Sequence, residues 1–146
     1  MSNRIEQKLK ELGHELAEAK LPVANYVPFT RYGNLVFISG QVSQIKGRLG
    51  EDVSEEDGYK AAQQCALSLI AQLKLACEGD LSQVKGCIKL GAFVNSTNDF
   101  IKQPAVANGA SDLIAETIGK HARAAVSANS LPNGVAVEVE GIFELI

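Results

Sequence analysis

The sequence predicts a single α+β domain, on three observations. The length of 146 residues lies within the usual size of one domain, for which one hydrophobic core is expected. Hydrophobic residues make up 46% of the chain and charged residues 21%, a composition typical of globular proteins. Segments with helical periodicity alternate with segments that read as strands, and no repeat or low-complexity tract interrupts them. One core with mixed elements is therefore expected.

The first elements expected along the chain are a helix and a strand. Apolar residues recur at helical spacing among Lys and Glu, which predicts a surface helix over residues 3–19, ended by Pro22. The apolar residues of that stripe are Ile5, Leu9, Leu12 and Leu16. Residues 34–39 are apolar on both alternating faces, which predicts a central strand that is covered on two sides.

A long helix and a second strand follow. Ser54 and Asp57 have the spacing of a capping box, so a helix is expected over residues 55–78, ended by Gly79. Several residues on one helical face are small, which would let the helix approach a sheet closely. Residues 87–95 are expected to form the next strand, and the turn-forming residues that follow end it.

The last quarter of the chain predicts one helix and two strands. Pro104 suits the first turn of a helix over residues 104–118. Strands are expected over residues 122–128 and 135–145, joined through the reversal signal Asn133-Gly134. A two-residue turn there would pair the two strands directly.

One residue of these two strands stands out as a candidate binding group. Arg123 lies among Ala, Val and Ser, and a guanidinium in a hollow between small side chains can bind a carboxylate bidentately. A small-carboxylate site at Arg123 is therefore expected. The residues alone are equally compatible with a structural ion pair to a glutamate. With a two-residue turn Arg123 would face Glu144 instead of Glu138, so strand spacing leaves its acidic neighbour open.

The last strand has a simple alternation. Its two faces differ in polarity, one apolar and one acidic. The apolar face carries Val135, Val137, Val139, Phe143 and Leu145, and the acidic face carries Glu138, Glu140 and Glu144.

Charge and cysteine content narrow the class of protein. The net charge of −3 and the scattered basic residues argue against a nucleic-acid partner. The chain has no apolar run long enough to span a bilayer, and the charged segment 1–10 does not resemble a signal peptide, so a cytoplasmic protein without a membrane partner is expected. Cys65, Cys77 and Cys87 form neither a CxxC pair nor an even set, which favours free thiols.

Two motifs resemble those of a known family. Residues 123–132, Arg-Ala-Ala-Val-Ser-Ala-Asn-Ser-Leu-Pro, and residues 135–140, Val-Ala-Val-Glu-Val-Glu, resemble the C-terminal signature of the Rid family, also called YjgF-like or L-PSP endoribonuclease-like proteins. Residues 33–41 are similar to that family's Gly-Asn-Leu-Val strand ending in Ser-Gly-Gln. Residues 98–100 resemble its Asn-Asp-Phe turn.

The resemblance implies a fold, an assembly and a division of the chain. It covers about residues 22–146 and leaves residues 1–21 as an N-terminal helical extension. The implied fold is chorismate-mutase-like, a mixed sheet with two helices packed on one face. The implied assembly is a homotrimer with three clefts between subunits. No metal and no organic cofactor is implied.

The family pattern assigns roles to several residues by resemblance. Arg123 would hold the substrate carboxylate, Glu138 would position or activate the hydrolytic water, and Ser39 would line the cleft. Tyr26 matches a family tyrosine by ungapped count, although its neighbours differ from the usual motif. Asn108 matches the family's helix asparagine after a four-residue shift.

One position departs from the family and bears on function. Ala125 stands at a substrate-binding position where many deaminating members carry a cysteine. Together with the changes around Tyr26 and Asn108, this implies a cleft of different shape.

The implied activity is the hydrolysis of reactive 2-imino or 2-enamino acids to 2-keto acids and ammonia. The alternative is a trimer that binds keto acids or similar small carboxylates without turning them over. Endoribonuclease activity, suggested only by the family's older name, is disfavoured because His14 and His121 indicate neither a catalytic pair nor a basic groove.

Overall fold

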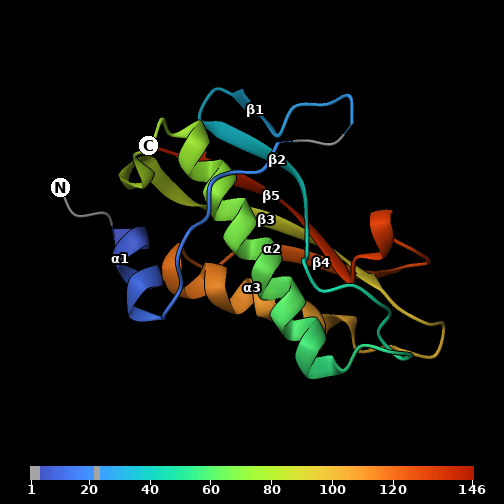
Figure 1. The fold of residues 1–146 in the computed structure, drawn as a ribbon. Helices are drawn as coiled ribbons and strands as arrows, with labels where there is room; N and C mark the ends of the chain where they lie inside the picture. The colour runs from blue at the N-terminus through green and yellow to red at the C-terminus, as the bar shows by residue number, and fades with distance from the viewer. Residues whose placement is uncertain (1–3, 22–23) are drawn as a thin grey trace.

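A computed structural model describes residues 4–21 and 24–146, and its centre is one mixed sheet of five strands in the order β1-β2-β5-β3-β4 (Figure 1). The strands are β1 (Phe29–Tyr32), β2 (Leu35–Val42), β3 (Val84–Asn95), β4 (Ala122–Ala128) and β5 (Val137–Leu145). Only β3 and β4 run parallel, while the other neighbours are antiparallel. The expected α+β class is confirmed.

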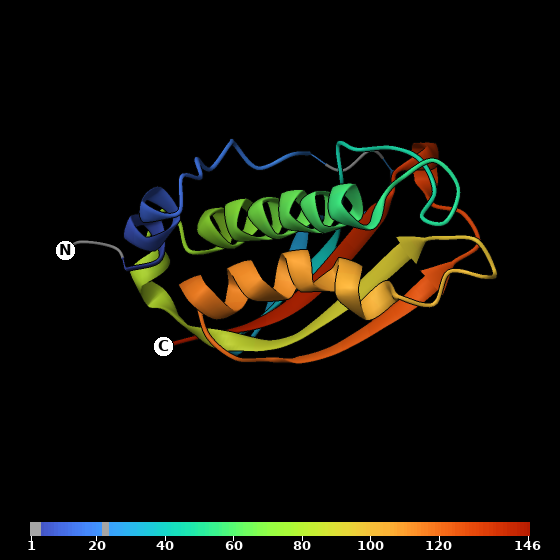
Figure 2. The same ribbon diagram turned by 90° about the horizontal axis from the view of Figure 1, so that it is seen from below.

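Helices cover one face of this sheet. The helices are α1 (Arg4–Glu11), α2 (Glu55–Ala76) and α3 (Gln103–Thr117), with 3-10 turns η1 (Leu81–Gln83) and η2 (Pro132–Gly134). Figure 2 shows α2 and α3 side by side on the same face of the sheet, and no helix of residues 4–21 and 24–146 lies on the opposite face. The prediction of two helices packed on one face is therefore confirmed.

The long helix α2 begins where the capping residues predict. Ser54 is the N-cap, and its hydroxyl accepts a hydrogen bond from the backbone N–H of Asp57 at 3.1 Å. The small side chains of Ala61, Ala62 and Ala66 are completely buried beneath it. Small residues on the inner face therefore bring α2 close to its neighbours.

Helices α2 and α3 approach each other closely at Gly109. A Cβ atom at this position would collide with the backbone carbonyl of Tyr59, which cannot move independently of α2. We expect Gly109→Ala to lower the free energy of unfolding by about 1–3 kcal/mol, because overpacking of a rigid contact outweighs the better helix propensity of alanine. Chemical denaturation would measure the difference. Gly86→Ala is the control, since no atom lies within 4 Å of a Cβ there; equal stability of the two variants would contradict this account.

The N-terminal helix is shorter than predicted. It ends at Glu11 and not at residue 19, because Gly13 has a φ of +84° and closes a Schellman motif. In that motif the N–H of His14 donates to the carbonyl of Leu9, and the N–H of Gly13 donates to the carbonyl of Lys10. The predicted stop at Pro22 lies outside the described residues.

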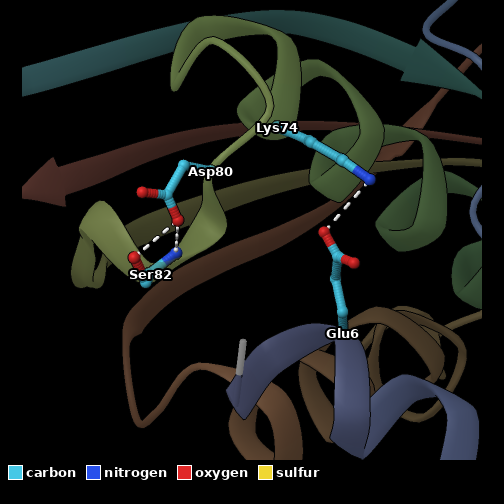
Figure 3. Close-up of polar contacts among 4 residues, drawn as sticks. All are labelled: Glu6, Lys74, Asp80 and Ser82. Atoms are coloured by element: carbon cyan, nitrogen blue, oxygen red, sulfur yellow. Dashed lines mark hydrogen bonds and ion pairs between the residues drawn. The ribbon is translucent and has the colours of Figure 1, made fainter. Parts of the chain in front are cut away.

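The N-terminal segment is nevertheless attached to the main body. Ile5 and Leu9 are buried in the same core as the sheet and the long helices. Glu6 of α1 pairs with Lys74 of α2 at 3.0 Å (Figure 3). In the same view the carboxylate of Asp80 caps η1 through the backbone N–H of Ser82. The division into an extension and a core domain stays a prediction.

The strands β4 and β5 do not form the predicted hairpin. The turn at η2 does reverse the chain, with Asn133 at a φ of 58°, but β3 lies between the two strands. The chain after the turn is bound on both sides, because the N–H of Ala136 donates to the carbonyl of Ile45 and its own carbonyl accepts from Asn95. Insertion between β2 and β3 lets β5 bury its apolar face in the centre of the sheet.

The edge strand β1 was not predicted. It pairs with β2 through a two-residue loop at Gly33 and Asn34, in which Gly33 has a φ of +61°. The strand β2 is central, as predicted, because it lies between β1 and β5. The expectation that both faces of this strand are covered is wrong for a single chain, since the side chain of Phe37 remains 40% exposed.

Candidate functional site

Arg123 lies on the helix-covered face of the sheet, at the edge strand β4. Its partner across the parallel pair with β3 is Leu90, which is completely buried. Side chains of paired residues point to the same face, so the Arg123 side chain points towards α3. There Nη1 donates to Oδ1 of Asn108 at 2.8 Å and to Oγ of Ser111 at 3.1 Å. Both acceptors are neutral.

The guanidinium keeps its charge and part of its donor capacity. Within the described part of the chain, Nε and Nη2 of Arg123 have no hydrogen-bond partner, and the residue forms no ion pair. Glu144, which a hairpin would have placed opposite, lies 3.7 Å from Nζ of Lys85 instead. The open edge of Nε and Nη2 has the geometry that binds a carboxylate bidentately.

Glu138 lies on the opposite face of the sheet. Its cross-strand partners are Val42 and Phe93, whereas the partner of Leu90 in β5 is Gly141, three residues further along. Because successive strand residues alternate between faces, an odd separation puts Glu138 and Arg123 on different sides. The expectation that Arg123 lies beside Glu138 is therefore wrong for the two residues of one chain.

The environment of Glu138 disfavours its charged form. The carboxyl group is half-buried, and burial, followed by the negative charge of Glu140, raises its pKa above the ordinary value. One oxygen lies so close to Gly40 that a Cβ atom there would collide with it. A cavity of about 400 Å³ borders Glu138, and Gly40, Tyr26 and Gln72 also line it. A carboxyl group with a raised pKa beside a cavity suits proton transfer.

The other predicted site residues divide between the two faces. Ala125 lies two residues after Arg123 on the same face of β4 and packs against the core. On the other side, Tyr26 borders the Glu138 cavity and also a groove that Ser39 lines. The Ser39 hydroxyl donates to the carbonyl of Val27 at 2.8 Å, which fixes the segment before β1. Arg123, Asn108 and Ala125 thus form one group, and Glu138, Tyr26 and Ser39 form the other.

Two residues near Arg123 were missed by the sequence analysis. Ser111 lies one helical turn after Asn108, and its hydroxyl also contacts Nε2 of His121 at 2.9 Å. His121 stands two residues before Arg123 and so shares its side of the strand. The spacing of Ser111 from Asn108 and that of His121 from Arg123 can be read from the sequence. Only the packing of α3 against β4 brings the two pairs of residues together.

The face of the sheet without helices is partly apolar. Phe37 and Val126 are 40% and 49% exposed there; Phe37 pairs with Ile142 on β5 and Val126 pairs with Phe93 on β3, so the face carries two apolar pairs at different positions along the strands. We call these four residues the open-face cluster. An apolar cluster on a sheet face is typical of a surface that packs against another chain.

The three cysteines do not belong to either group, although the Cys65 thiol donates to the carbonyl of Val137, next to Glu138, at 3.3 Å. All three are free and buried. Burial raises the pKa of Cys87 to about 12 and that of Cys65 well above its ordinary value. They are free thiols, as predicted, and their burial suits small core residues and not nucleophiles.

Two further features bear on possible partners. Among the helices of residues 4–21 and 24–146, none is long and apolar enough to cross a membrane. The same residues contain no group of three or more His, Cys, Asp or Glu side chains placed to hold a metal ion.

Comparison with known proteins identifies relatives of the whole chain. The sequence model of the family described as "YjgF/chorismate mutase-like, putative endoribonuclease" matches residues 6–137. Protein TCP17 of Trypanosoma cruzi is 42% identical, over 99% of this chain and 96% of the relative. The match with the family model begins inside α1.

Solved structures share the fold. The crystal structure of Atu1372 from Agrobacterium tumefaciens, described as a protein of unknown function, has a TM-score of 0.91 at 45% identity and covers 97% of this chain and 92% of its own. The structure of E. coli TdcF with bound serine has a TM-score of 0.58 at 25% identity, over 88% of this chain and 94% of its own. The expected chorismate-mutase-like fold is confirmed by these likenesses.

Proposed function

Because the chain belongs to the YjgF/chorismate mutase-like family, we propose that it hydrolyses reactive 2-imino or 2-enamino acids to 2-keto acids and ammonia. Family membership itself suggests a deaminase-like or small-molecule-binding role. The observation that carries the finer proposal is the guanidinium of Arg123, which neutral groups hold through one nitrogen while its other donors stay free within the described residues. A fixed guanidinium with an open edge suits a substrate that always carries a carboxylate.

We further propose that each active site is shared between two copies of the chain in a homotrimer. Arg123 and Glu138 lie on opposite faces of one sheet, so they can act on one small molecule only if they come from different subunits. The open-face cluster supports this assembly, because it offers apolar surface on the face that Glu138 occupies. The clefts between subunits would then bring Arg123, Asn108 and Ala125 of one chain to Glu138, Tyr26 and Ser39 of the next.

In the proposed reaction, Arg123 holds the carboxylate of the imino acid and places its C=N carbon beside a water molecule. The imine enters as the protonated form C=NH2+; Glu138 takes a proton from the water as the new C–O bond forms, and the electron pair of the C=N double bond moves to nitrogen, which becomes a neutral amine. The proton on Glu138 then passes to nitrogen as the C–N bond breaks, and the hydroxyl proton returns to Glu138 as the C=O bond forms. The 2-keto acid and ammonia are released, and ammonia takes the proton from Glu138 as ammonium, which restores the carboxylate. A carboxyl group with a raised pKa is suited to both transfers.

An assay of the parent protein tests this proposal directly. The imine 2-iminopropanoate is generated in situ from alanine by an amino acid oxidase, and ammonia release is compared with the spontaneous rate. We expect the protein to accelerate hydrolysis, with a rate that is proportional to its concentration. A rate equal to the spontaneous one at every protein concentration would overturn the proposed activity.

The alternative function is a trimer that binds small carboxylates without chemistry. The bound serine of TdcF favours it, because that ligand also carries a carboxylate. Under this alternative, 2-oxobutanoate would raise the melting temperature by binding the folded state selectively, while 2-iminopropanoate would be hydrolysed no faster than in buffer. Thermal unfolding and the ammonia assay together separate the two functions.

We do not extend the proposal to RNA cleavage. His14 lies just after α1 and His121 just before β4, so they belong to separate parts of the fold. The net charge of −3 also disfavours binding to a polyanion. An endoribonuclease would need a basic groove, which this composition does not favour.

Gly40 offers a test of how closely Glu138 must be placed. In Gly40→Ala the new methyl group would displace the Glu138 carboxylate, which is the end of a flexible side chain and can move without unfolding the protein. We expect kcat to fall by about tenfold with little change in melting temperature, since a small misplacement of a proton-transfer group is costly. Steady-state kinetics and thermal unfolding measure the two effects. Unchanged kcat in a folded Gly40→Ala protein would argue against a role for Glu138.

A further inference from the structure

We propose that His121, acting through Ser111, is a positioning residue that fixes the orientation of the Arg123 guanidinium. This inference rests on the proposed function and adds two residues to its carboxylate site. The His121 Nε2 atom lies 2.9 Å from the Ser111 hydroxyl, which in turn lies 3.1 Å from Nη1 of Arg123. The three side chains form a continuous path of hydrogen bonds from the edge strand to α3.

The partners of His121 determine the direction of these hydrogen bonds. Its Nδ1 atom lies 3.1 Å from the carbonyl of Gly119, which can only accept, so Nδ1 carries the proton. In the neutral ring Nε2 is then an acceptor, and the Ser111 hydroxyl donates to it. The Ser111 oxygen therefore presents its lone pairs to Arg123. The Gly119 carbonyl, two residues before His121, thus determines which group donates and which group accepts in each hydrogen bond of this path.

This arrangement determines which edge of the guanidinium faces outward. The two hydrogens of Nη1 go to Asn108 and Ser111, which lie one turn apart on α3. Two fixed acceptors at one nitrogen define the plane of the guanidinium, and they leave Nε and Nη2 as the free edge among the described residues. A site that is oriented before binding loses less entropy when the ligand arrives.

Binding of two matched ligands tests the proposal. The probes are 2-oxobutanoate, which carries a carboxylate, and 2-oxobutanamide, which has a similar shape without the charge. In His121→Leu we expect the Kd of 2-oxobutanoate, measured by titration calorimetry on the full assembly, to rise about tenfold, because Ser111 loses its acceptor and turns its own proton towards Arg123. The Kd of the amide is expected to stay unchanged. A loss of general structure would instead weaken both ligands equally, and that result would overturn the inference.

Two further variants test whether His121 acts through Ser111. His121→Gln retains an oxygen acceptor within reach of Ser111 and is expected to restore most of the carboxylate affinity. Ser111→Ala removes the hydroxyl from an α-helix that tolerates alanine, and we expect it to match His121→Leu, with the double variant no weaker than either single one. Additive losses in the double variant would show that the two residues act separately and would contradict the path.

The failure of this inference differs from the failure of the proposed function. If the parent binds 2-oxobutanoate and Arg123→Ala abolishes binding while His121→Leu does not, the carboxylate site stands and the role of His121 is wrong. If the parent itself does not distinguish 2-oxobutanoate from the amide, both the site and its positioning residues are wrong.

Discussion

Replacing Arg123 by alanine is expected to lower kcat/KM for 2-iminopropanoate by about 100- to 1,000-fold. The variant loses two charge-assisted hydrogen bonds to the substrate carboxylate, and with them the placement of the C=N carbon near the water. Stability should change little, because within the described residues the guanidinium makes hydrogen bonds to two polar side chains and no ion pair. Steady-state kinetics of parent and variant measure the effect.

Two controls accompany this variant. Arg123→Lys keeps the charge but loses the planar fork, so we expect it to recover only part of the activity. Arg31→Ala removes an exposed arginine of β1 whose Nε donates to the carbonyl of Gly33, and it should retain parental kcat/KM. If Arg123→Ala is as active as the parent, the proposed substrate site is wrong.

The second large effect is expected for Glu138→Gln. Glutamine preserves the shape of the side chain but cannot take a proton from water, so kcat should fall by about 100-fold or more. The KM should change much less, because the carboxylate of the substrate binds at Arg123. A variant that changes KM alone would assign Glu138 to binding and not to the chemical step.

The pH dependence of the parent follows from the raised pKa of Glu138. The ionised carboxylate is the active base, so activity is expected above this pKa and is lost as the pH falls through it. Glu140→Gln removes the charge that contributes to the shift, and the acid limb of its pH–rate profile should move to lower pH. A limb that stays in place would exclude Glu138 as the group that titrates.

The raised pKa of Glu138 affects stability in the opposite direction from activity, because rising pH increases activity and decreases the contribution of this group to folding. A carboxyl group whose pKa is raised in the folded state favours folding below its unfolded pKa, and this contribution is lost as the pH rises through the folded value. Glu138→Gln should therefore unfold at a higher temperature than the parent at neutral pH, and the difference should vanish in acid. The gain is expected to be modest because the group is only half-buried.

Local signals predicted the elements well. The capping residue Ser54 gave the start of α2 to the residue, and the alternation of β5 correctly separated Val137 and Val139 from Glu138. The errors arose where the sequence pattern is local but the structure depends on strands that are distant in the sequence. The turn at Asn133 exists, yet β5 pairs with β2 and β3, because its apolar face is buried best in the middle of the sheet.

The contacts within the candidate site could not be predicted from local sequence patterns either. The family motif identified Arg123 and Asn108 separately, and their hydrogen bond depends on the packing of α3 against the edge strand. The sequence could not place Glu138 relative to Arg123, because their faces depend on the register of β3 between them. Ser111 and His121 were missed for a related reason, since a serine and a histidine ten residues apart carry no signal until two elements meet.

The most direct test of the shared site is complementation between two inactive variants. Arg123→Ala and Glu138→Gln proteins are unfolded together in equal amounts, refolded, and assayed with 2-iminopropanoate beside each variant treated alone. If Arg123 of one subunit acts with Glu138 of the next, random mixing restores both intact residues to about a quarter of the clefts, and about that fraction of parental activity should return. Activity no greater than that of the separate variants, in a mixture that forms trimers, would contradict a site built from two chains.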